Sequence, residues 1–395
     1  MVDLGMSPLC ESYVPPERLN QSEPFYPLIV YVCKKCFLVQ VLEYVTAESI
    51  FTEYAYFSSF SDSWVRHAEK YTEMIIERFG LDRKNRIIEL ASNDGYLLQH
   101  FVSRSIPVLG IEPAANIALA AEHKGVPTLV RFFGTQVAQE LVGQGTQADL
   151  LVGNNVLAQV PDLNDFVAGM KLLLKPDGVV TMEFPHLMRL MAENQFDTIY
   201  HEHYSYFSLL TVEDVLAKHG LRLFDVEEIP THGGSLRVYA CHAESRSHAV
   251  CDRIAELRSR ETAAGLCTLS QYAAFGKQVE ETKYKLLSFL IEIKRQGKSI
   301  VGYGAPGKGN TLLNYCGIRR DFIDYTVDRN PYKQGKYLPG SRIPIFAPER
   351  IQQTRPDFVF ILPWNLKDEI MAQLSFVREW GGKFIVPIPE VRIYS

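Results

Sequence analysis

One short segment, residues 200–206, gathers side chains that can exchange protons. It reads Tyr-His-Glu-His-Tyr-Ser-Tyr, so seven consecutive residues carry a phenol, an imidazole, a carboxylate or a hydroxyl. Histidine changes charge near neutral pH, and a neighbouring carboxylate adjusts its proton affinity. The segment is therefore a candidate site of acid–base chemistry, although His201 is expected to face away. An ordinary solvated loop is the alternative interpretation.

A second group of polar residues follows a buried strand predicted at residues 86–90. Residues 91–95 read Ala-Ser-Asn-Asp-Gly, and their small side chains let a ligand approach the backbone. Glu112 ends the next predicted strand, where a carboxylate can bind both hydroxyls of a ribose. The loop lacks the glycines with which G-x-G-x-x-G loops hold a diphosphate, so it indicates a nucleoside without phosphates. S-adenosylmethionine is the commonest such ligand, and a purely structural turn is the alternative.

The predicted cofactor contacts lie at the ends of three predicted strands, where open parallel sheets bind their ligands. Asn154 and Asn155 end the strand that begins near Asp149. The full predicted set is Glu89, Ala91, Asn93, Gly95, Glu112, Asn154 and Asn155.

A glycine-rich loop near residue 304 forms a third candidate site. Residues 302–307 read Gly-Tyr-Gly-Ala-Pro-Gly, after a predicted strand and before a predicted helix. With Asp328 ending the following strand, the pattern is typical of NAD binding, although a proline is unusual within it. The loop, Gly304 included, can instead present backbone amides to a diphosphate, with Lys308 adding positive charge. A tight turn that packs a helix on a sheet is the structural alternative.

The cysteines indicate a reducing environment and an incomplete metal site. The chain has seven cysteines, an odd number at uneven spacing, which disfavours a disulfide framework. Cys33 and Cys36 form a C-x-x-C pair, which is half of the usual ligand set of a structural zinc ion. Cys10 is a candidate third ligand, and no fourth cysteine lies in this region. A packed pair of cysteines without metal is the alternative.

The elements that must position these residues alternate between buried strands and helical patterns. Strands predicted near residues 86–90, 108–112, 148–152 and 178–182 are separated by helices, which indicates a parallel sheet covered on both faces. A long helical pattern over residues 250–297 precedes a second alternation. We expect an α/β protein with a Rossmann-like central domain, a smaller Rossmann-like C-terminal domain and a small N-terminal module. The predicted boundaries are 1–60 for the N-terminal module, 61–248 for the cofactor domain, 249–297 for connecting helices and 298–395 for the C-terminal domain.

Length and charge narrow the function further. A chain of 395 residues exceeds one typical domain, and its net charge of −5 with only short basic runs disfavours a nucleic-acid partner. No apolar stretch is long enough to span a bilayer, and the N-terminus lacks a signal-peptide pattern. We expect a cytoplasmic protein without a membrane partner. The oligomeric state is not predicted, and a monomer is compatible with the sequence.

Five motifs together resemble one family, the sugar C-methyltransferases of deoxysugar pathways. They begin at Glu89 (Glu-Leu-Ala-Ser-Asn-Asp-Gly-Tyr), Asn154 (Asn-Asn-Val-Leu), Tyr200 (Tyr-His-Glu-His), His232 (His-Gly-Gly-Ser-Leu-Arg) and Gly304 (Gly-Ala-Pro-Gly-Lys-Gly-Asn-Thr-Leu-Leu-Asn). The resemblance covers essentially the whole chain. It implies a small zinc module, a central S-adenosylmethionine domain and a C-terminal domain that helps bind a nucleotide-linked sugar. It also implies methylation at C3 of a dTDP-4-keto-deoxysugar.

The resemblance implies roles for single residues as well. The family's Tyr-x-Glu-His motif falls on Tyr200, Glu202 and His203, so His203 is implied as the base that removes the C3 proton. Glu202 would orient or polarise that base, and Tyr200 would donate a hydrogen bond to the developing enolate. The expected substrate-binding residues are Tyr54, Tyr56, Gln159, His232, Arg237, Gly304, Lys308 and Asn310.

The chain departs from the family pattern at two positions. Three alternative functions are also compatible with the sequence. The family commonly has an earlier C-x-x-C, upstream of where this chain starts, so we expect a truncated start or a lost zinc ion. Gln159 stands where the family commonly has histidine. The rivals are an NAD(P)-dependent nucleotide-sugar oxidoreductase, an O- or N-methyltransferase and a non-catalytic nucleotide-sugar binding protein.

Overall fold

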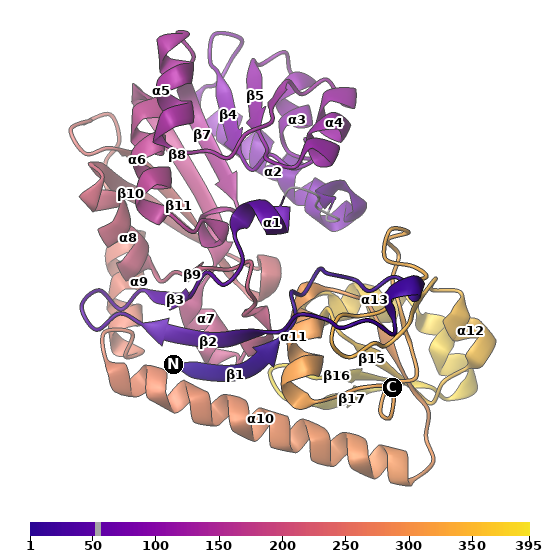
Figure 1. Ribbon diagram of the computed structural model, residues 1–395. Helices are drawn as coiled ribbons and strands as arrows, with labels where there is room; N and C mark the ends of the chain where they lie inside the picture. Colours follow the sequence, from indigo (N-terminus) through magenta and orange to yellow (C-terminus); the bar gives the residue numbers. More distant parts are fainter. Residues whose placement is uncertain (52–56) are drawn as a thin grey trace.

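The computed structural model describes residues 1–51 and 57–395, and Figure 1 shows how three sheets divide the chain. Tyr54 and Tyr56, predicted to contact the sugar, lie outside the described residues. The expected α/β class is confirmed, because two of the sheets are mainly parallel and helices pack against them. Within the described residues no helix combines the length and the apolar character needed to cross a membrane.

The central sheet carries the predicted cofactor loop and has seven strands. Its parallel half forms from apolar runs that are buried along their length, such as Ile87–Leu90. Two antiparallel strands complete one edge. In spatial order the strands are β10 (Leu221–Ile229), β11 (Ser235–His242), β8 (Leu174–Pro185), β7 (Ala148–Asn154), β4 (Ile87–Leu90), β5 (Val108–Ile111) and β6 (Thr128–Leu129).

Helix α2 (Asp62–Phe79) shows how the sequence determines the ends and the buried face of a helix in this region. Ser61 caps its start by accepting a hydrogen bond from the Trp64 N–H, and Gly80 ends it in the left-handed conformation, as its position predicts. The buried residues Ala68, Tyr71 and Ile75 form the face that packs on the sheet. The other helices here are α3 (Leu98–Val102), α4 (Ala115–His123), α5 (Thr135–Gly143), α6 (Leu163–Leu173), α7 (Leu187–Ala192) and α8 (Leu209–Lys218).

A small N-terminal sheet holds the polar segment 200–206 in place. Its strand β3 pairs with β9, which consists of Ser205 and Tyr206 and lies inside that segment. The backbone N–H of Val41 also donates to the Tyr204 carbonyl at 3.0 Å. The strands run in the order β1 (Val2–Ser7), β2 (Tyr26–Val32), β3 (Val39–Val41) and β9 (Ser205–Tyr206), and α1 (Ala47–Phe51) follows β3.

The long helical pattern predicted over residues 250–297 is two helices. They are α9 (Asp252–Ala263) and α10 (Leu269–Arg295), and Gly265 separates them because its φ of 83° is left-handed. Helix α10 lies along the N-terminal strands in Figure 1 and buries Tyr272, Val279 and Leu290. These side chains belong to one hydrophobic core that the N-terminal strands share with the C-terminal sheet.

The C-terminal sheet carries the second glycine loop between β12 and α11. Five of its strands are parallel and the last is antiparallel. In order they are β14 (Ile345–Phe346), β13 (Thr326–Val327), β12 (Ile300–Tyr303), β15 (Phe358–Ile361), β16 (Lys383–Val386) and β17 (Arg392–Tyr394). The helices are α11 (Gly307–Cys316), α12 (Arg350–Thr354) and α13 (Lys367–Gln373).

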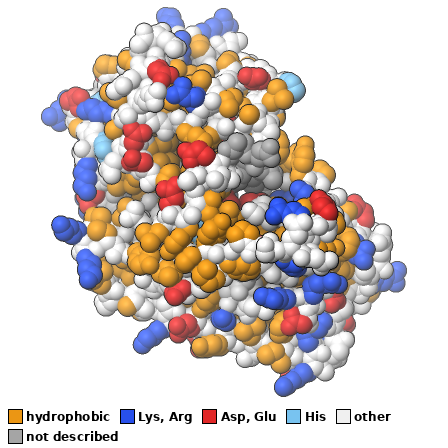
Figure 2. All heavy atoms as spheres, in the orientation of Figure 1, with side chains coloured by type: hydrophobic (Ala, Val, Ile, Leu, Met, Phe, Trp, Pro, Cys, Tyr) orange, Lys and Arg blue, Asp and Glu red, His pale blue; other side chains and the backbone are white. Residues whose placement is uncertain are grey.

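The N-terminal sheet buries only one of its faces. Figure 2 shows apolar side chains gathered over the region where Figure 1 places β1–β3. Met6, Tyr31 and Leu42 are 56%, 46% and 51% exposed, whereas Leu28 and Val30 are buried in the shared core.

Candidate active site

His203 is a buried imidazole whose proton is fixed on one nitrogen. Its Nδ1 lies 3.1 Å from the Thr198 carbonyl, and a carbonyl only accepts, so Nδ1 carries the hydrogen. The lone pair is therefore on Nε2. Burial lowers the pKa of His203 to about 4, and the charge of Lys308 adds to that effect. The side chain is thus a neutral base at pH 7, with the Tyr200 ring packed 4.1 Å from it.

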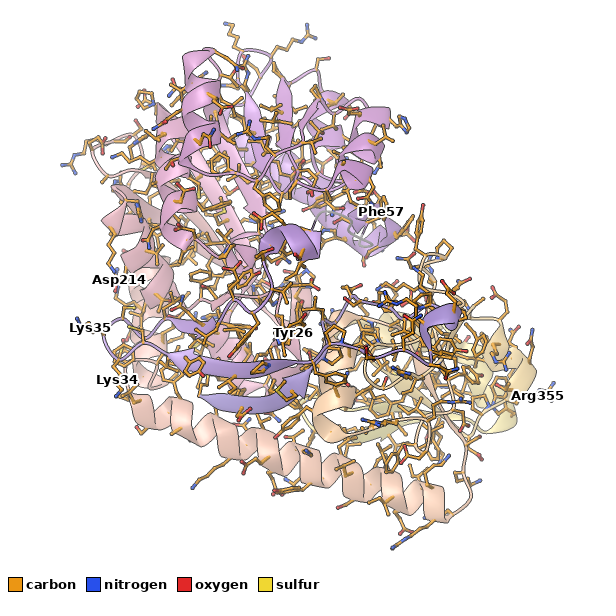
Figure 3. The ribbon with its side chains drawn as sticks, in the orientation of Figure 1. Tyr26, Lys34, Lys35, Phe57, Asp214 and Arg355 are labelled. Atoms are coloured by element: carbon orange, nitrogen blue, oxygen red, sulfur yellow. The ribbon has the colours of Figure 1, made fainter. Side chains whose placement is uncertain are left out.

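The two residues before His203 point in other directions. The Glu202 carboxylate accepts a hydrogen bond from the Cys10 thiol at 3.3 Å. His201 contacts the Pro27 carbonyl through Nε2 at 3.1 Å, and its ring packs edge-on against Tyr26, which Figure 3 labels. His201 therefore faces the N-terminal sheet, as expected. Thr198 makes the contact that fixes the His203 ring, a role that the sequence pattern assigned to Glu202.

The predicted cofactor loop combines strained backbone with buried carboxylates. Ala91 and Asn93 have φ values of 53° and 47°, and Gly95 has 74°. Glu89 is fully buried, and burial raises its pKa well above the usual range, with the charge of Glu112 contributing. Within the described residues, Asp94 Oδ1 and Asn154 Nδ2 are buried without a hydrogen-bond partner. A buried group of carboxylates suits S-adenosylmethionine, because that molecule carries a sulfonium and an ammonium.

Glu112 shows how the loop is held. Its two carboxylate oxygens accept the backbone N–H groups of Asn93 at 3.0 Å and Ala114 at 2.9 Å. Burial, partly offset by these two hydrogen bonds, raises its pKa to about 7. Glu89, Glu112 and Asn154 lie at or directly after the ends of three neighbouring strands, as the sequence predicts.

The residues directly after the undescribed segment lie on this loop. The N–H of Ser58 donates to Asn93 Oδ1 at 2.9 Å, and Ser59 donates to Asp94 at 3.3 Å. Phe57, labelled in Figure 3, stacks on Tyr332 of the C-terminal domain with ring centroids 5.6 Å apart. Residues 57–59 therefore contact both the cofactor loop and the C-terminal domain.

His232 is a second imidazole, beside the end of strand β7. It occupies the short helix η5 (Thr231–Gly233) with a left-handed φ of 54°. Its Nε2 is 3.2 Å from the Asn155 amide nitrogen, and its ring packs edge-on against Trp64. His232 also affects the pKa of His203, so the two imidazoles lie within electrostatic reach of each other. Trp64 has no motif in the sequence that marks it as a site residue.

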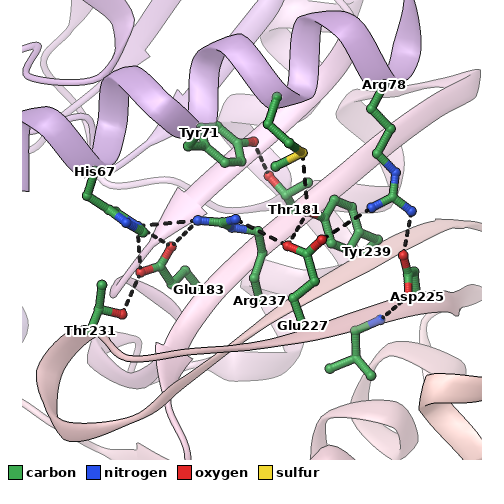
Figure 4. A network of polar contacts seen from close by, with 12 residues as sticks. His67, Tyr71, Arg78, Thr181, Glu183, Asp225, Glu227, Thr231, Arg237 and Tyr239 are labelled. Carbon is green, nitrogen blue, oxygen red and sulfur yellow. Dashed lines mark hydrogen bonds and ion pairs between the residues drawn. The ribbon is translucent and has the colours of Figure 1, made fainter.

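Arg237, expected to bind substrate, lies behind this site in a buried network (Figure 4). Its guanidinium pairs with Glu183 at 3.1 Å and with Glu227 at 3.2 Å. It also covers the Tyr71 ring of α2. These contacts engage Nη1 and Nη2 of the guanidinium within the network that supports the site. Gln159 is partly buried in the short helix η3 (Leu157–Gln159).

Lys308, in the C-terminal domain, places its positive charge within electrostatic reach of the His203 and His232 imidazoles. Its ammonium donates to Asn365 at 2.8 Å and lies 4.7 Å above the Trp364 ring. Burial lowers the pKa of Lys308 to about 8. The same charge lowers the pKa of His203 and of His232, so three groups from distant parts of the chain converge here.

The second glycine loop is closed by other parts of the chain. Asp328 accepts the backbone N–H groups of Ala305 at 2.7 Å and Asn330 at 2.8 Å. A Cβ on Gly307, at the start of α11, would lie 3.6 Å from the Glu11 carboxylate. The chain's own anion thus lies where a dinucleotide diphosphate would bind. The geometry therefore disfavours the nicotinamide alternative.

Two further predicted residues of this loop make internal contacts. Asn310 donates from its amide to the Cys10 carbonyl at 2.6 Å. Gly304 has a φ of 89°, and a Cβ there would lie 2.6 Å from Pro363. Both residues hold the loop against neighbouring segments.

The half zinc site lies at the end of the β2–β3 hairpin, where Figure 3 labels Lys34 and Lys35. Backbone N–H groups of Cys36 and Lys35 lower the pKa of Cys33. Among residues 1–51 and 57–395, no group of three or more histidine, cysteine, aspartate or glutamate side chains could hold a metal. Cys10 instead donates to Glu202, so the described residues do not fit a structural zinc ion.

Comparisons with known proteins match each part of the chain. Three family models cover residues 1–51 ("Putative zinc binding domain"), 64–226 ("Methyltransferase domain") and 230–389 ("C-methyltransferase C-terminal domain"). All 395 residues align at 36% identity with the C-methyltransferase NovU of Streptomyces niveus, over 94% of that protein. A ubiquinone biosynthesis O-methyltransferase of Bartonella tribocorum is 26% identical over 96 residues, which are 24% of this chain and 39% of that protein.

Among solved structures, magnesium protoporphyrin IX methyltransferase of Synechocystis with bound S-adenosylmethionine aligns with a TM-score of 0.35. The identity is 12%, over 45% of this chain and 79% of that one.

Proposed function

The chain belongs to a family of S-adenosylmethionine-dependent C-methyltransferases, and from that premise we propose that it methylates C3 of a nucleotide-linked 4-keto-deoxysugar. The nucleotide of the proposed substrate is dTDP. The observation that carries the proposal is the state of His203, a buried neutral imidazole with its lone pair on Nε2. A base of this kind suits removal of a proton from carbon beside a ketone.

In the proposed reaction, His203 Nε2 takes the C3 proton, and the C–H electrons move onto the neighbouring carbonyl to form an enolate. Burial raises the pKa of Tyr200 well above its usual range, so its phenol stays protonated and can donate to that oxygen. S-adenosylmethionine, when bound, would supply an electrophilic methyl group to the enolate carbon, and the electrons of the broken methyl–sulfur bond would stay on sulfur in S-adenosylhomocysteine. Glu89, Glu112 and Asn154 would hold that molecule at the strand ends.

Lys308 is the best-placed residue of the C-terminal loop to meet the anionic part of the substrate. Its ammonium is buried beside Trp364 and lies within electrostatic reach of His203 and His232. A cation there would hold the sugar nucleotide with its keto group beside the base. The other C-terminal groups, Gly304 and Asn310, support the loop that presents Lys308.

The test is a panel of dTDP-4-keto-deoxysugars incubated with methyl-labelled S-adenosylmethionine, with mass and NMR analysis of each product. We expect at least one product with the label on carbon at C3. A label on oxygen or nitrogen would show an O- or N-methyltransferase instead, and absence of transfer across the panel would overturn the sugar substrate.

The base is tested by His203→Asn. This variant should bind S-adenosylmethionine normally but lose deuterium exchange at C3, with a fall of about 10²–10⁴-fold. Exchange and methylation at the wild-type rate would remove His203 from the proposed mechanism.

A further inference from the structure

The turn that carries His232 is strained, and several contacts hold it. His232 adopts a left-handed φ of 54°, which is unfavourable for a residue other than glycine. The Gly233 carbonyl accepts from the Gln195 amide at 2.7 Å, and the Gly234 carbonyl accepts from the His186 N–H at 3.0 Å. A strained conformation that its surroundings enforce is often part of a functional site.

His232 and His203 carry their protons on opposite ring nitrogens. His203 donates from Nδ1 to the Thr198 carbonyl, which leaves a lone pair on Nε2. His232 faces the Asn155 amide nitrogen with its Nε2, so Nε2 accepts and the hydrogen is on Nδ1. One imidazole is thus set as a proton acceptor and the other as a neutral N–H donor.

We propose that His232 donates a hydrogen bond to the substrate oxygen on which charge develops, and that Glu183 is the residue that positions it. The proposal rests on the proposed function and deepens it, because it names a second donor, beside Tyr200, for the enolate that His203 generates. Sequence motifs alone give His232 no task beyond closing the site.

A neutral donor suits this task. Burial, reinforced by the charge of Lys308, lowers the pKa of His232 to about 4. The ring is therefore an imidazole and not an imidazolium at pH 7, so it stabilises an enolate without protonating it. Pairing a base with a neutral histidine beside the carbonyl is an established solution for enolisation.

Glu183 connects both groups that flank His232. Its backbone carbonyl accepts the Asn155 N–H at 2.7 Å, and its carboxylate accepts the Thr231 hydroxyl at 3.0 Å. His67 and Arg237 hold the same carboxylate, as Figure 4 shows. Glu183 is fully buried; burial would raise its pKa, but the His67 hydrogen bond and the Arg237 charge keep the pKa below its usual value.

The chain offers a matched control within the same network. Asp225 lies near the other end of α2, where Arg78 and Arg253 pair with it (Figure 4 shows Arg78 and Asp225). Glu183 and Asp225 are both buried carboxylates that connect α2 to the sheet. Only Glu183 also contacts the turn of His232, so a purely structural role would affect both variants alike.

The first experiment measures deuterium exchange at C3 of the accepted sugar nucleotide without S-adenosylmethionine. His232→Asn keeps a residue that tolerates the left-handed conformation but shortens the donor. We expect the exchange rate to fall about 10²–10³-fold, with KM changed little, because loss of one donor to a developing oxyanion has that effect. Exchange at the wild-type rate in this variant would overturn the donor role.

The second experiment tests the positioning. Thr231→Val removes the hydroxyl that donates to Glu183 at nearly constant volume, and Thr231→Ser keeps it. We expect Thr231→Val and Glu183→Gln to slow exchange by up to about 100-fold, since small displacements of a catalytic group have effects of this size. Thr231→Ser and Asp225→Asn should exchange within about twofold of wild type. An equal loss in Asp225→Asn, or no loss in Thr231→Val, would overturn the positioning role.

The experiments distinguish failure of the proposed function from failure of the role proposed for His232. If wild-type protein neither exchanges C3 deuterium nor transfers methyl to any sugar nucleotide, the proposed function fails. If wild-type protein is active and His203→Asn is inactive while His232→Asn is unaffected, only the present inference fails.

Discussion

The two strand–loop–helix units of this protein look alike in sequence pattern and differ in what occupies them. The loop after β4 keeps buried carboxylates at its strand ends, and Asp94 and Asn154 each have a buried polar atom without a partner among the described residues. The loop after β12 has the glycines of a dinucleotide site, yet Glu11 lies at the start of α11. The G-x-G-x-x-G motif therefore predicts the conformation of the loop backbone. The surrounding residues determine whether a ligand can bind there.

The largest expected change in ligand affinity that tests the difference between the two loops comes from replacing Glu112, the acid of the first loop. Glu112→Ala removes the proposed acceptor for the ribose and the anchor of the Asn93 and Ala114 N–H groups. We expect the Kd for S-adenosylmethionine, measured by calorimetry, to rise by about 100-fold, because hydrogen bonds to charged groups are worth roughly 1.5–3 kcal/mol. Asp328→Asn is the matched change in the second loop and should leave that Kd within about twofold. Similar losses in both variants would show that the loops are not distinct.

The role of Glu11 in closing the second loop is tested by measuring the stability of the protein. Glu11 and Lys333 form an ion pair at 3.4 Å whose side chains are 15% and 8% exposed. Glu11→Gln leaves that buried ammonium without its counter-charge, so we expect the free energy of unfolding to fall by about 3 kcal/mol in urea denaturation.

A surface pair provides the control for this stability loss. Asp62 and Arg329 lie 3.8 Å apart and are both more than half exposed, so Asp62→Asn should change stability by less than about 0.5 kcal/mol. Unchanged stability in Glu11→Gln would mean that the carboxylate does not hold the second loop closed.

The smallest expected effect is a pH dependence of the first loop. Burial raises the pKa of Glu112 to about 7, so the carboxylate is mainly ionised at pH 8 and mainly protonated at pH 6. A ribose hydroxyl donates better to the ionised form. The affinity for S-adenosylmethionine should therefore fall by up to about tenfold from pH 8 to pH 6. Glu112→Gln should bind more weakly but without this slope, and tighter binding at pH 6 in wild type would contradict the assignment.

The sequence predicts well what depends on neighbouring residues. The strand at Ile87–Leu90, the helix that ends at Gly80 and the acids at strand ends all follow from local patterns. The sequence predicts connecting helices over residues 249–297 but does not locate the break between α9 and α10, because one glycine inside a helical pattern does not specify a turn.

Local sequence patterns do not predict contacts between residues that are distant in the sequence. Cys10 meets Glu202 and Glu11 meets Lys333 through tertiary packing, and neither pair has a local signal. The strained turn at His232 likewise depends on Glu183, which lies on another strand. The polar segment could thus be recognised as a site from its composition, whereas the partners that set its protonation could not.

The core shared by the N-terminal strands, α10 and the C-terminal sheet has a consequence for synthesis of the protein. Strand β3 ends at Val41, but its core partner α10 begins only at Leu269. At a translation rate of about 5–20 residues per second, the first strands emerge from the ribosome roughly 10–50 s before that partner. During that interval the α10 side chains that share this core with Leu28 and Val30 have not yet been made. The core of the N-terminal strands is therefore completed only after α10 and the C-terminal sheet have been synthesised.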